Sequence, residues 1–236
     1  MHFHVITLFP EPFDSYINES IIGRAVADKK IKISFYPLRK YAPKELRKKW
    51  PDGNVTTYVD GRPFGGGPGM VLRAEPFLKA VEAAISNIQK TNTKKQTNPK
   101  AKKSKTKIIF FSPAGKHFTT GVAKEYSKKF TDIILICGRY EGIDARVKKI
   151  LKAEEVSIGD YVLTGGELPA MVLIDCIARQ IPGVLGNFDS REEERVASSD
   201  VYTRPEILVW NGKKHKVPPV LLSGDPKKID AWKQGL

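Results

Sequence analysis

Apolar residues gather in short runs, separated by amphipathic stretches, along the first 186 residues of the chain. Runs rich in β-branched and aromatic residues predict strands at 2–10, 31–38, 107–112, 132–137 and 155–158. Apolar positions three or four residues apart predict helices at 12–29, 74–89, 121–130 and 144–151. The run 132–137 is apolar after its first residue, as in a parallel sheet covered on both faces. The alternation predicts an α/β fold, a parallel sheet with helices on both faces.

The pattern changes after Gly186. Residues 187–200, NFDSREEERVASSD, are polar and lack apolar periodicity, which predicts a linker. Residues 201–236 contain a helical stretch near 225–232 and are too few to form a robust core of their own. We therefore expect an α/β domain over 1–186, a linker over 187–200 and a small, mainly helical unit over 201–236.

The chain carries a net charge of +14, which favours a nucleic-acid partner because lysine and arginine release counterions from phosphates. Eight of its lysines lie in one low-complexity stretch, residues 90–107, and without them the net charge falls to +6. We expect this stretch to be a disordered, solvated surface insertion rather than a specific RNA contact.

Cysteine and histidine positions predict neither a disulfide nor a metal site. Cys137 and Cys176 lack metal-ligand spacing and are expected to be buried small side chains. His2 and His4 have strand spacing, and we expect them on one face of an edge strand rather than as a ligand pair. No apolar run could span a bilayer and the first residues lack a signal peptide's features, so we expect a cytoplasmic protein without a membrane partner.

Four glycine-rich segments are the strongest candidates for chemistry: GGGPGM at 65–70, SPAGK at 112–116, GRYEGID at 138–144 and GDYVLTGGEL at 159–168. Neither a P-loop nor a GxGxxG fingerprint is present, which argues against an ordinary nucleotide-phosphate cradle. The last three segments follow predicted strands, and ligands of open parallel sheets bind beyond the carboxyl ends of strands. Together they predict a pocket of backbone N–H and C=O groups suited to an adenine edge and a ribose.

A helix is expected from Pro169 through the apolar run AMVLIDCIARQ. Asp175 and Arg179 lie one turn apart inside this run, where charges are costly unless they are satisfied. The two side chains can pair with each other, or Arg179 can serve the chemistry of a site.

The motifs GGGPGM, CGRYEGID, SIGDYVLTGGELPAM, IPGVLG, YTRPE and VPPVLLSG, in this order, resemble the bacterial tRNA (guanine-N1)-methyltransferase family, TrmD. The resemblance covers nearly the whole chain outside the lysine-rich stretch. It implies a SPOUT-type α/β domain with a C-terminal trefoil knot, a homodimer, and S-adenosylmethionine bound in the knot. It also implies methylation of N1 of guanine 37, just 3′ of the anticodon in tRNA, a dependence on Mg²⁺, and a tRNA-binding role for residues 201–236.

The resemblance assigns a role to several groups of residues. The implied cofactor-binding residues are Ser112, Pro113, Gly115, Gly138, Tyr140, Glu141, Ile158, Gly159, Tyr161, Leu163, Gly165, Gly166 and Pro169. The implied substrate-binding residues are Asp60, Arg62, Gly67 and Asp200. The metal ligands are not indicated.

The implied chemistry needs a general base, because N1 of guanine carries a proton at neutral pH. The family uses an aspartate fifteen residues after the arginine that Arg179 matches, and that position is Glu194 here. Glu193 and Asp200 remain alternatives for the base because the linker is short. Arg179 would stabilise the negative charge that develops on O6.

Two other functions remain open at the level of sequence. The first is a noncatalytic RNA-binding protein of the same fold. This alternative stays open because the chain has Glu194 where the family has an aspartate. The second is methylation of another RNA site, against which the YTRPE and VPPVLLSG motifs argue.

Overall fold

The computed structural model describes residues 1–95, 104–186 and 200–235, without the side chains of 92–95. The chain divides into two compact units, Met1–Val184 and Leu185–Leu236, and each is described by itself. Glu193 and Glu194, and residues 96–103 of the lysine-rich stretch, lie outside the described residues. The ends of that stretch are not disordered as expected, because residues 90–95 continue a helix and residues 106–107 begin a strand.

The first unit is built on a five-stranded sheet in the order β2-β1-β8-β7-β9, and every pair in it is parallel. The strands are β1 (His2–Thr7), β2 (Lys32–Pro37), β7 (Thr106–His117), β8 (Asp132–Ile136) and β9 (Glu154–Ser157). All five residues of β8, the central strand, are buried. The predicted α/β fold with a parallel sheet is therefore confirmed.

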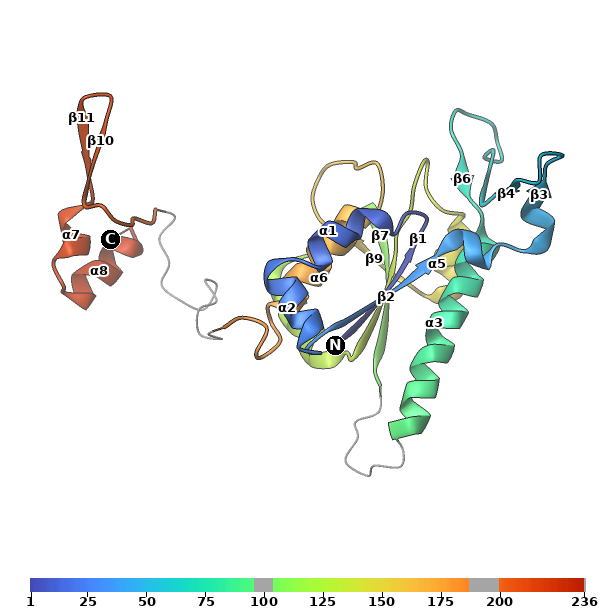
Figure 1. Cartoon of the computed structure of the whole chain (residues 1–236), viewed down its shortest axis with the longest axis horizontal. Coiled ribbons are helices and arrows are strands. Elements are labelled where there is room, and N and C mark those ends of the chain that lie inside the picture. Colours follow the sequence, from blue (N-terminus) through green and yellow to red (C-terminus); the bar gives the residue numbers. More distant parts are fainter. Residues whose placement is uncertain (96–103, 187–199, 236) are drawn as a thin grey trace. The chain divides into compact units, whose positions relative to one another are not determined.

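Helices cover both faces of the sheet, and consecutive residues of β8 supply the two cores. Ile133 and Leu135 pack in the core that includes the buried side of α6 (Glu167–Ala178), whereas Ile134 and Ile136 pack with α3 (Ala74–Lys95). The first face also holds α1 (Asp14–Ile17), α2 (Ser20–Ala27) and α4 (Thr120–Lys129), and the second holds α5 (Ala145–Leu151). Figure 1 shows α1, α2 and α6 on one side of the sheet and α3 on the other.

The helix predicted over 12–29 is divided into three pieces, which are the 3₁₀ turn η1 (Glu11–Phe13), α1 and α2. The Asn18 side-chain amide donates to the carbonyl of Asp14 at 2.7 Å, and Glu19 is extended, so α1 ends there. Strand β7 is longer than predicted, because its register against β9 shifts between Phe111 and Lys116 and pairing then resumes. The expectation of an edge strand for His2 and His4 is wrong, since β1 lies between β2 and β8.

Residues 39–69, for which the sequence pattern predicts no helix or strand, do contain secondary structure. They contain the 3₁₀ turns η2 (Leu38–Tyr41) and η3 (Lys44–Leu46) and an antiparallel pair, β3 (Arg47–Lys49) with β4 (Val55–Thr57). Trp50 closes this hairpin, donating its indole N–H to the Thr56 hydroxyl at 2.9 Å. A second short pair, β5 (Asp60–Gly61) with β6 (Val71–Leu72), encloses the GGGPGM segment.

The second unit contains a hairpin that the apolar pattern did not predict, β10 (Ile207–Trp210) with β11 (Lys213–Lys216). Its turn is Asn211–Gly212, and both residues have positive φ, the requirement of the tight turn that joins such strands. The unit also has α7 (Pro219–Leu222) and α8 (Pro226–Lys233), the latter capped by the Asp225 carboxylate. The expectation of a mainly helical unit therefore missed its strands.

Two expectations from the sequence concern the burial of the cysteines and the presence of membrane-spanning segments. Cys137 is fully buried and Cys176 is partly buried, and neither forms a disulfide. In the described parts of the chain, no helix is both long enough and apolar enough to cross a membrane.

Candidate cofactor pocket and active site

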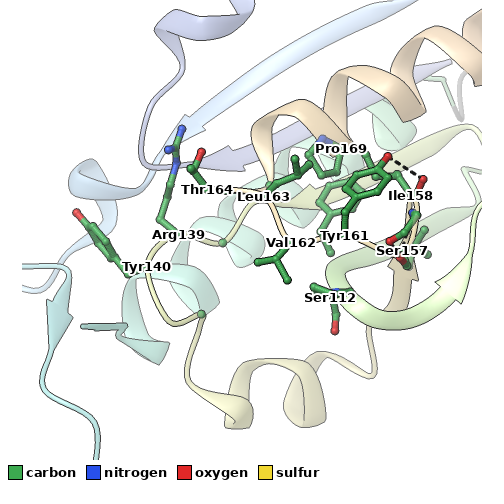
Figure 2. A pocket seen from close by; sticks show the side chains of 18 of the residues that line it. Ser112, Arg139, Tyr140, Ser157, Ile158, Tyr161, Val162, Leu163, Thr164 and Pro169 are labelled. Carbon is green, nitrogen blue, oxygen red and sulfur yellow. Dashed lines mark hydrogen bonds between the residues drawn. The ribbon is translucent and has the colours of Figure 1, made fainter. Parts of the chain in front are cut away.

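A cavity of about 280 Å³ lies at the register shift of β7 and beyond the ends of β8 and β9, between three of the glycine-rich segments. Twelve of the thirteen predicted cofactor residues line it, all except Gly115. The twelve are Ser112, Pro113, Gly138, Tyr140, Glu141, Ile158, Gly159, Tyr161, Leu163, Gly165, Gly166 and Pro169. Figure 2 shows Tyr161 and Val162, on the loop between β9 and α6, facing the turn that carries Ser112.

Gly166 fixes the loop before α6 directly on the end of β8. Its N–H donates to the carbonyl of Gly138 at 2.9 Å. A Cβ at this position would lie 2.6 Å from the Cα of Cys137 and 2.9 Å from the backbone nitrogen of Gly138. The residue before it, Gly165, forms a bridge with Arg139. Only a glycine allows the two backbones to approach this closely.

The segment that leaves β9 is held by its own side chains. The Ser157 hydroxyl donates to the carbonyl of Gly159 at 2.9 Å and accepts from the Gly159 N–H at 3.2 Å. The Tyr161 hydroxyl donates to the carbonyl of Ile158 at 3.1 Å, the dashed line in Figure 2. Gly159 has φ of +157°, and a Cβ there would lie 2.3 Å from the Tyr161 ring. These contacts place an aromatic ring at the cavity wall.

Gly115 has a different place from the one expected. It is not among the residues that line the cavity. A Cβ there would lie 2.6 Å from the backbone nitrogen of Val156, so this glycine allows β7 to run against the backbone of β9. Its structural role is close strand packing behind the cavity.

Seven wall residues were not singled out from the sequence: Phe111, Arg139, Gly142, Val156, Ser157, Val162 and Thr164. Arg139 and Gly142 lie inside the GRYEGID motif, and Ser157, Val162 and Thr164 lie inside the following one, so membership of a motif was the available signal. Phe111 and Val156 lie directly before two of the motifs, in β7 and β9. In the sequence they look like ordinary apolar strand residues of a core.

A buried carboxylate joins the cavity wall to the start of α6. The Glu167 side chain is 3% exposed, and one of its oxygens lies 2.9 Å from Nε of Arg139. Its other oxygen accepts from the Thr7 hydroxyl at 2.7 Å. The Arg139 guanidinium also lies over the Phe9 ring, 5.1 Å from its centroid.

Burial, and then the charge of Glu167, raises the pKa of the Cys137 thiol, which makes this cysteine an unreactive core residue.

The GGGPGM segment is held beside the cavity by backbone hydrogen bonds. Glu141 donates its N–H to the carbonyl of Met70 at 3.1 Å, and Leu72 donates to the carbonyl of Gly142 at 2.9 Å. A Cβ on Gly69, whose φ is +82°, would lie 2.5 Å from the Glu141 carboxylate. Two of the three predicted substrate residues of this region, Asp60 and Arg62, lie at or just after β5, on the opposite arm of the same loop. The third, Gly67, is exposed at its tip.

Arg179 lies at the C-terminal end of α6 and is partly buried. Asp175, one turn earlier, accepts a hydrogen bond from the Tyr16 hydroxyl of α1. Burial, followed by this hydrogen bond, raises the pKa of Tyr16. Asp175 therefore has a partner on another helix. Asp200 is exposed at the start of the described part of the second unit.

A sequence model of one protein family, described as tRNA (Guanine-1)-methyltransferase TrmD, matches residues 1–236. The chain belongs to the TrmD family. The match covers both structural units, so the TrmD family accounts for the hairpin-containing C-terminal unit as well as for the sheet domain.

Three curated proteins named tRNA (guanine-N(1)-)-methyltransferase are similar to this chain along nearly its whole length. A tRNA (guanine-N(1)-)-methyltransferase of Ruminiclostridium cellulolyticum is 44% identical, over 99% of this chain and 89% of its own length. One from Clostridioides difficile is 42% identical, over 99% and 91%. One from Pseudoalteromonas atlantica is 42% identical, over 98% and 78%.

Proposed function

We propose that this chain transfers a methyl group from S-adenosylmethionine to N1 of a guanine in tRNA, and that the guanine is residue 37. The observation that carries the proposal is the cavity between the register shift of β7 and the ends of β8 and β9, whose wall contains twelve of the thirteen residues implied by the TrmD motifs. Membership of the TrmD family along residues 1–236 supports the same reaction. A tRNA substrate would place the protein in the cytoplasm.

The cavity fits the proposed cofactor because its wall is largely backbone and apolar surface. Gly138, Gly165 and Gly166 have no side chains, so a ligand can approach the backbone closely and bond to groups other than the Gly166 N–H, which already donates to the Gly138 carbonyl. Tyr161, Val162 and Leu163 offer apolar surface to the adenine ring and the methionine chain. S-adenosylmethionine, when bound, supplies a methyl group already activated on a sulfonium.

The remaining chemistry falls to side chains that act on guanine. A carboxylate has to remove the N1 proton, and we assign this role to Glu194, with Glu193 and Asp200 as alternatives. Arg179 would stabilise the negative charge that grows on O6 as the proton leaves. Asp60, Arg62 and Gly67 would contact the target base or its neighbours, since the loop that carries them is bonded to the cavity wall. The target base has to leave its stack to reach them.

We assign no step to Mg²⁺. Within residues 1–95, 104–186 and 200–235, the grouped metal-type donors are His2, His4 and Asp132, at the amino ends of β1 and β8. Imidazoles suit transition metals better than Mg²⁺, which prefers oxygen ligands. These donors therefore do not fit a magnesium site beside the cavity.

The knotted threading, the homodimer and a tRNA-binding role for residues 201–236 belong to the same proposal. Close contact of Gly166 with the end of β8 supports the threading of the segment before α6. Exposed apolar side chains on α6 support a dimer: Leu168 is 56% exposed and Val172 is 40% exposed. Such side chains are costly in water unless a partner covers them. A second copy would also help to complete the site for tRNA.

Replacing Leu168 by Asp is expected to convert the dimer to a monomer at micromolar concentration, because a charge would be buried at the contact. The dissociation constant should rise by roughly 100-fold, the effect of losing a central contact residue. Size-exclusion chromatography with light scattering measures the change. Ile150→Asp is the matched control, since Ile150 is 60% exposed on α5, against the other face of the sheet. If the Leu168→Asp protein remains dimeric, α6 is not part of the dimer interface.

The function is tested with purified protein, S-adenosylmethionine and a tRNA transcript carrying guanines at positions 36 and 37. We expect one methyl group per transcript, found as 1-methylguanosine at position 37 by nuclease digestion and mass spectrometry. Replacing guanine 37 should abolish incorporation. Methylation of a different position would support the alternative RNA substrate. Cofactor binding with no methyl transfer to any transcript would support the noncatalytic RNA-binding alternative.

A further inference from the structure

Three metal-type donors come together at the end of the sheet opposite the cofactor cavity. His2 is the first residue of β1 and Asp132 is the first of β8, and they are partners in the register of these two parallel strands. His4 lies two residues after His2 and so projects from the same face of the sheet. One potential ligand atom from each of the three side chains lies within 4.8 Å of the other two. Neither the cavity nor the proposed methyl transfer uses these residues.

The remaining polar atoms of the three side chains are held by hydroxyl groups. Nε2 of His2 lies 2.9 Å from the Ser34 hydroxyl, and Nδ1 of His4 lies 3.1 Å from the Tyr36 hydroxyl. Oδ2 of Asp132 accepts from the Thr131 hydroxyl at 2.7 Å. Outer partners of this kind orient metal-binding imidazoles and carboxylates.

The three remaining atoms lie close together, and two of them, Nε2 of His4 and Oδ1 of Asp132, are hydrogen-bonded to each other, a bond that an ion would replace. Oδ1 of Asp132 lies 3.2 Å from Nε2 of His4 and 3.8 Å from Nδ1 of His2. Zinc bonds of about 2.0–2.1 Å at tetrahedral angles place neighbouring ligand atoms about 3.3 Å apart. The His4 and Asp132 atoms already have this spacing, and the His2 ring has to move closer.

We propose that His2, His4 and Asp132 bind one divalent transition-metal ion, with Zn²⁺ as the expected ion. Two imidazoles and one carboxylate are ligands that Zn²⁺ accepts, and water can supply the fourth. The side chain of His4 is 0% exposed, that of Asp132 is 10% exposed and that of His2 is 22% exposed. The site is therefore open on the side of His2, the residue that has to move, and this side admits both the ion and a water.

The bound ion would join the first residues of β1 to β8. This inference goes beyond the proposed methyl transfer, because the cavity lies at the carboxyl ends of the strands and the cluster at the amino ends of β1 and β8. Failure of the metal site would leave the methyltransferase proposal unchanged, and the reverse also holds.

The test uses the untagged full chain, treated with a chelator and then dialysed against Zn²⁺ in a series of concentrations. We expect one Zn²⁺ per chain by elemental analysis. We also expect Co²⁺, added as a spectroscopic probe, to give the visible absorption of a four- or five-coordinate site. His2→Gln should weaken Zn²⁺ binding by about 100-fold or more, while Ser34→Ala should weaken it by about 10-fold through loss of the partner of His2.

His215→Gln is the matched control, since His215 is an exposed histidine of β11. It should keep the stoichiometry and the affinity of the parent chain. His2→Gln is preferred to a His4 variant because the His2 ring is partly exposed and its loss should leave the fold intact, which circular dichroism checks. Zn²⁺ should raise the melting temperature of the parent chain but not that of His2→Gln. Binding of less than one ion in ten chains, or equal affinity in His2→Gln, would overturn the proposal.

Discussion

Replacing Glu194 by Gln is expected to slow methylation of the tRNA by about 100- to 10,000-fold in a single turnover, the range attributed to a positioned general base. Glutamine has nearly the same shape as glutamate, but its amide cannot take the N1 proton of guanine. The affinity for S-adenosylmethionine should change little, because every described residue that lines the cavity is kept in this variant. Rapid-quench measurement with saturating enzyme and cofactor gives the rate, and calorimetry gives the affinity.

Glu193→Gln and Asp200→Asn are the matched controls for this variant. Each removes one carboxylate from the same part of the chain, and each should keep most of the single-turnover rate. A pH profile adds a second readout, because the rate of the parent chain should fall as the base becomes protonated. Full activity in Glu194→Gln together with a large loss in one control would transfer the role of base to that residue.

Replacing Gly166 by Ala is expected to weaken binding of S-adenosylmethionine by about 10- to 100-fold. The added methyl group would lie 2.6 Å from the Cα of Cys137, a backbone atom in a buried residue that cannot move aside as a side chain could. The loop before α6 then has to move away from β8, and the cavity opens. Overpacking of this kind costs about 1–3 kcal/mol, which corresponds to the expected loss of affinity.

Gly186→Ala is the control for this second variant. No described atom lies within 4 Å of a Cβ at Gly186, and its φ is not in the left-handed region, so its affinity should equal that of the parent chain. Thermal unfolding separates a local change from loss of the fold. If Gly166→Ala binds the cofactor like Gly186→Ala, the contact with β8 does not shape the cavity.

The position of Gly166 also shows how a few glycines shape the site. Gly166 permits the contact between the last loop and β8, and Gly115 permits the contact between β7 and β9. Gly69 permits the GGGPGM segment to lie against the Glu141 side chain. Each contact joins two segments that are distant in sequence. The cavity wall is therefore formed mainly by how closely backbones can approach, and side chains such as Tyr161 and the Arg139–Glu167 pair then fix its shape.

The sequence alone determined the class of fold and most of the cavity wall. An unbroken apolar run such as 133–137 is stable only where both faces are covered, and it is indeed the buried centre of the sheet. The TrmD motifs identified twelve wall residues because they carry the irregular part of β7 and the loops that follow β8 and β9. The hairpin at Asn211–Gly212 was not predicted, because its strands, ILVW and KKHK, lack the apolar and polar alternation that marks a half-buried strand.

Only the tertiary structure decided which distant residues meet. Hydrophobic periodicity encodes which face of an element is buried, but not which strand is its neighbour. The order β2-β1-β8-β7-β9 places β1 beside β8, and this brings His2 and His4 to Asp132, some 130 positions away in the chain. It also supplies Asp175 with Tyr16, and Glu167 with Thr7, as partners. Such pairs follow from strand order and helix packing, which depend on the free energy of the whole fold.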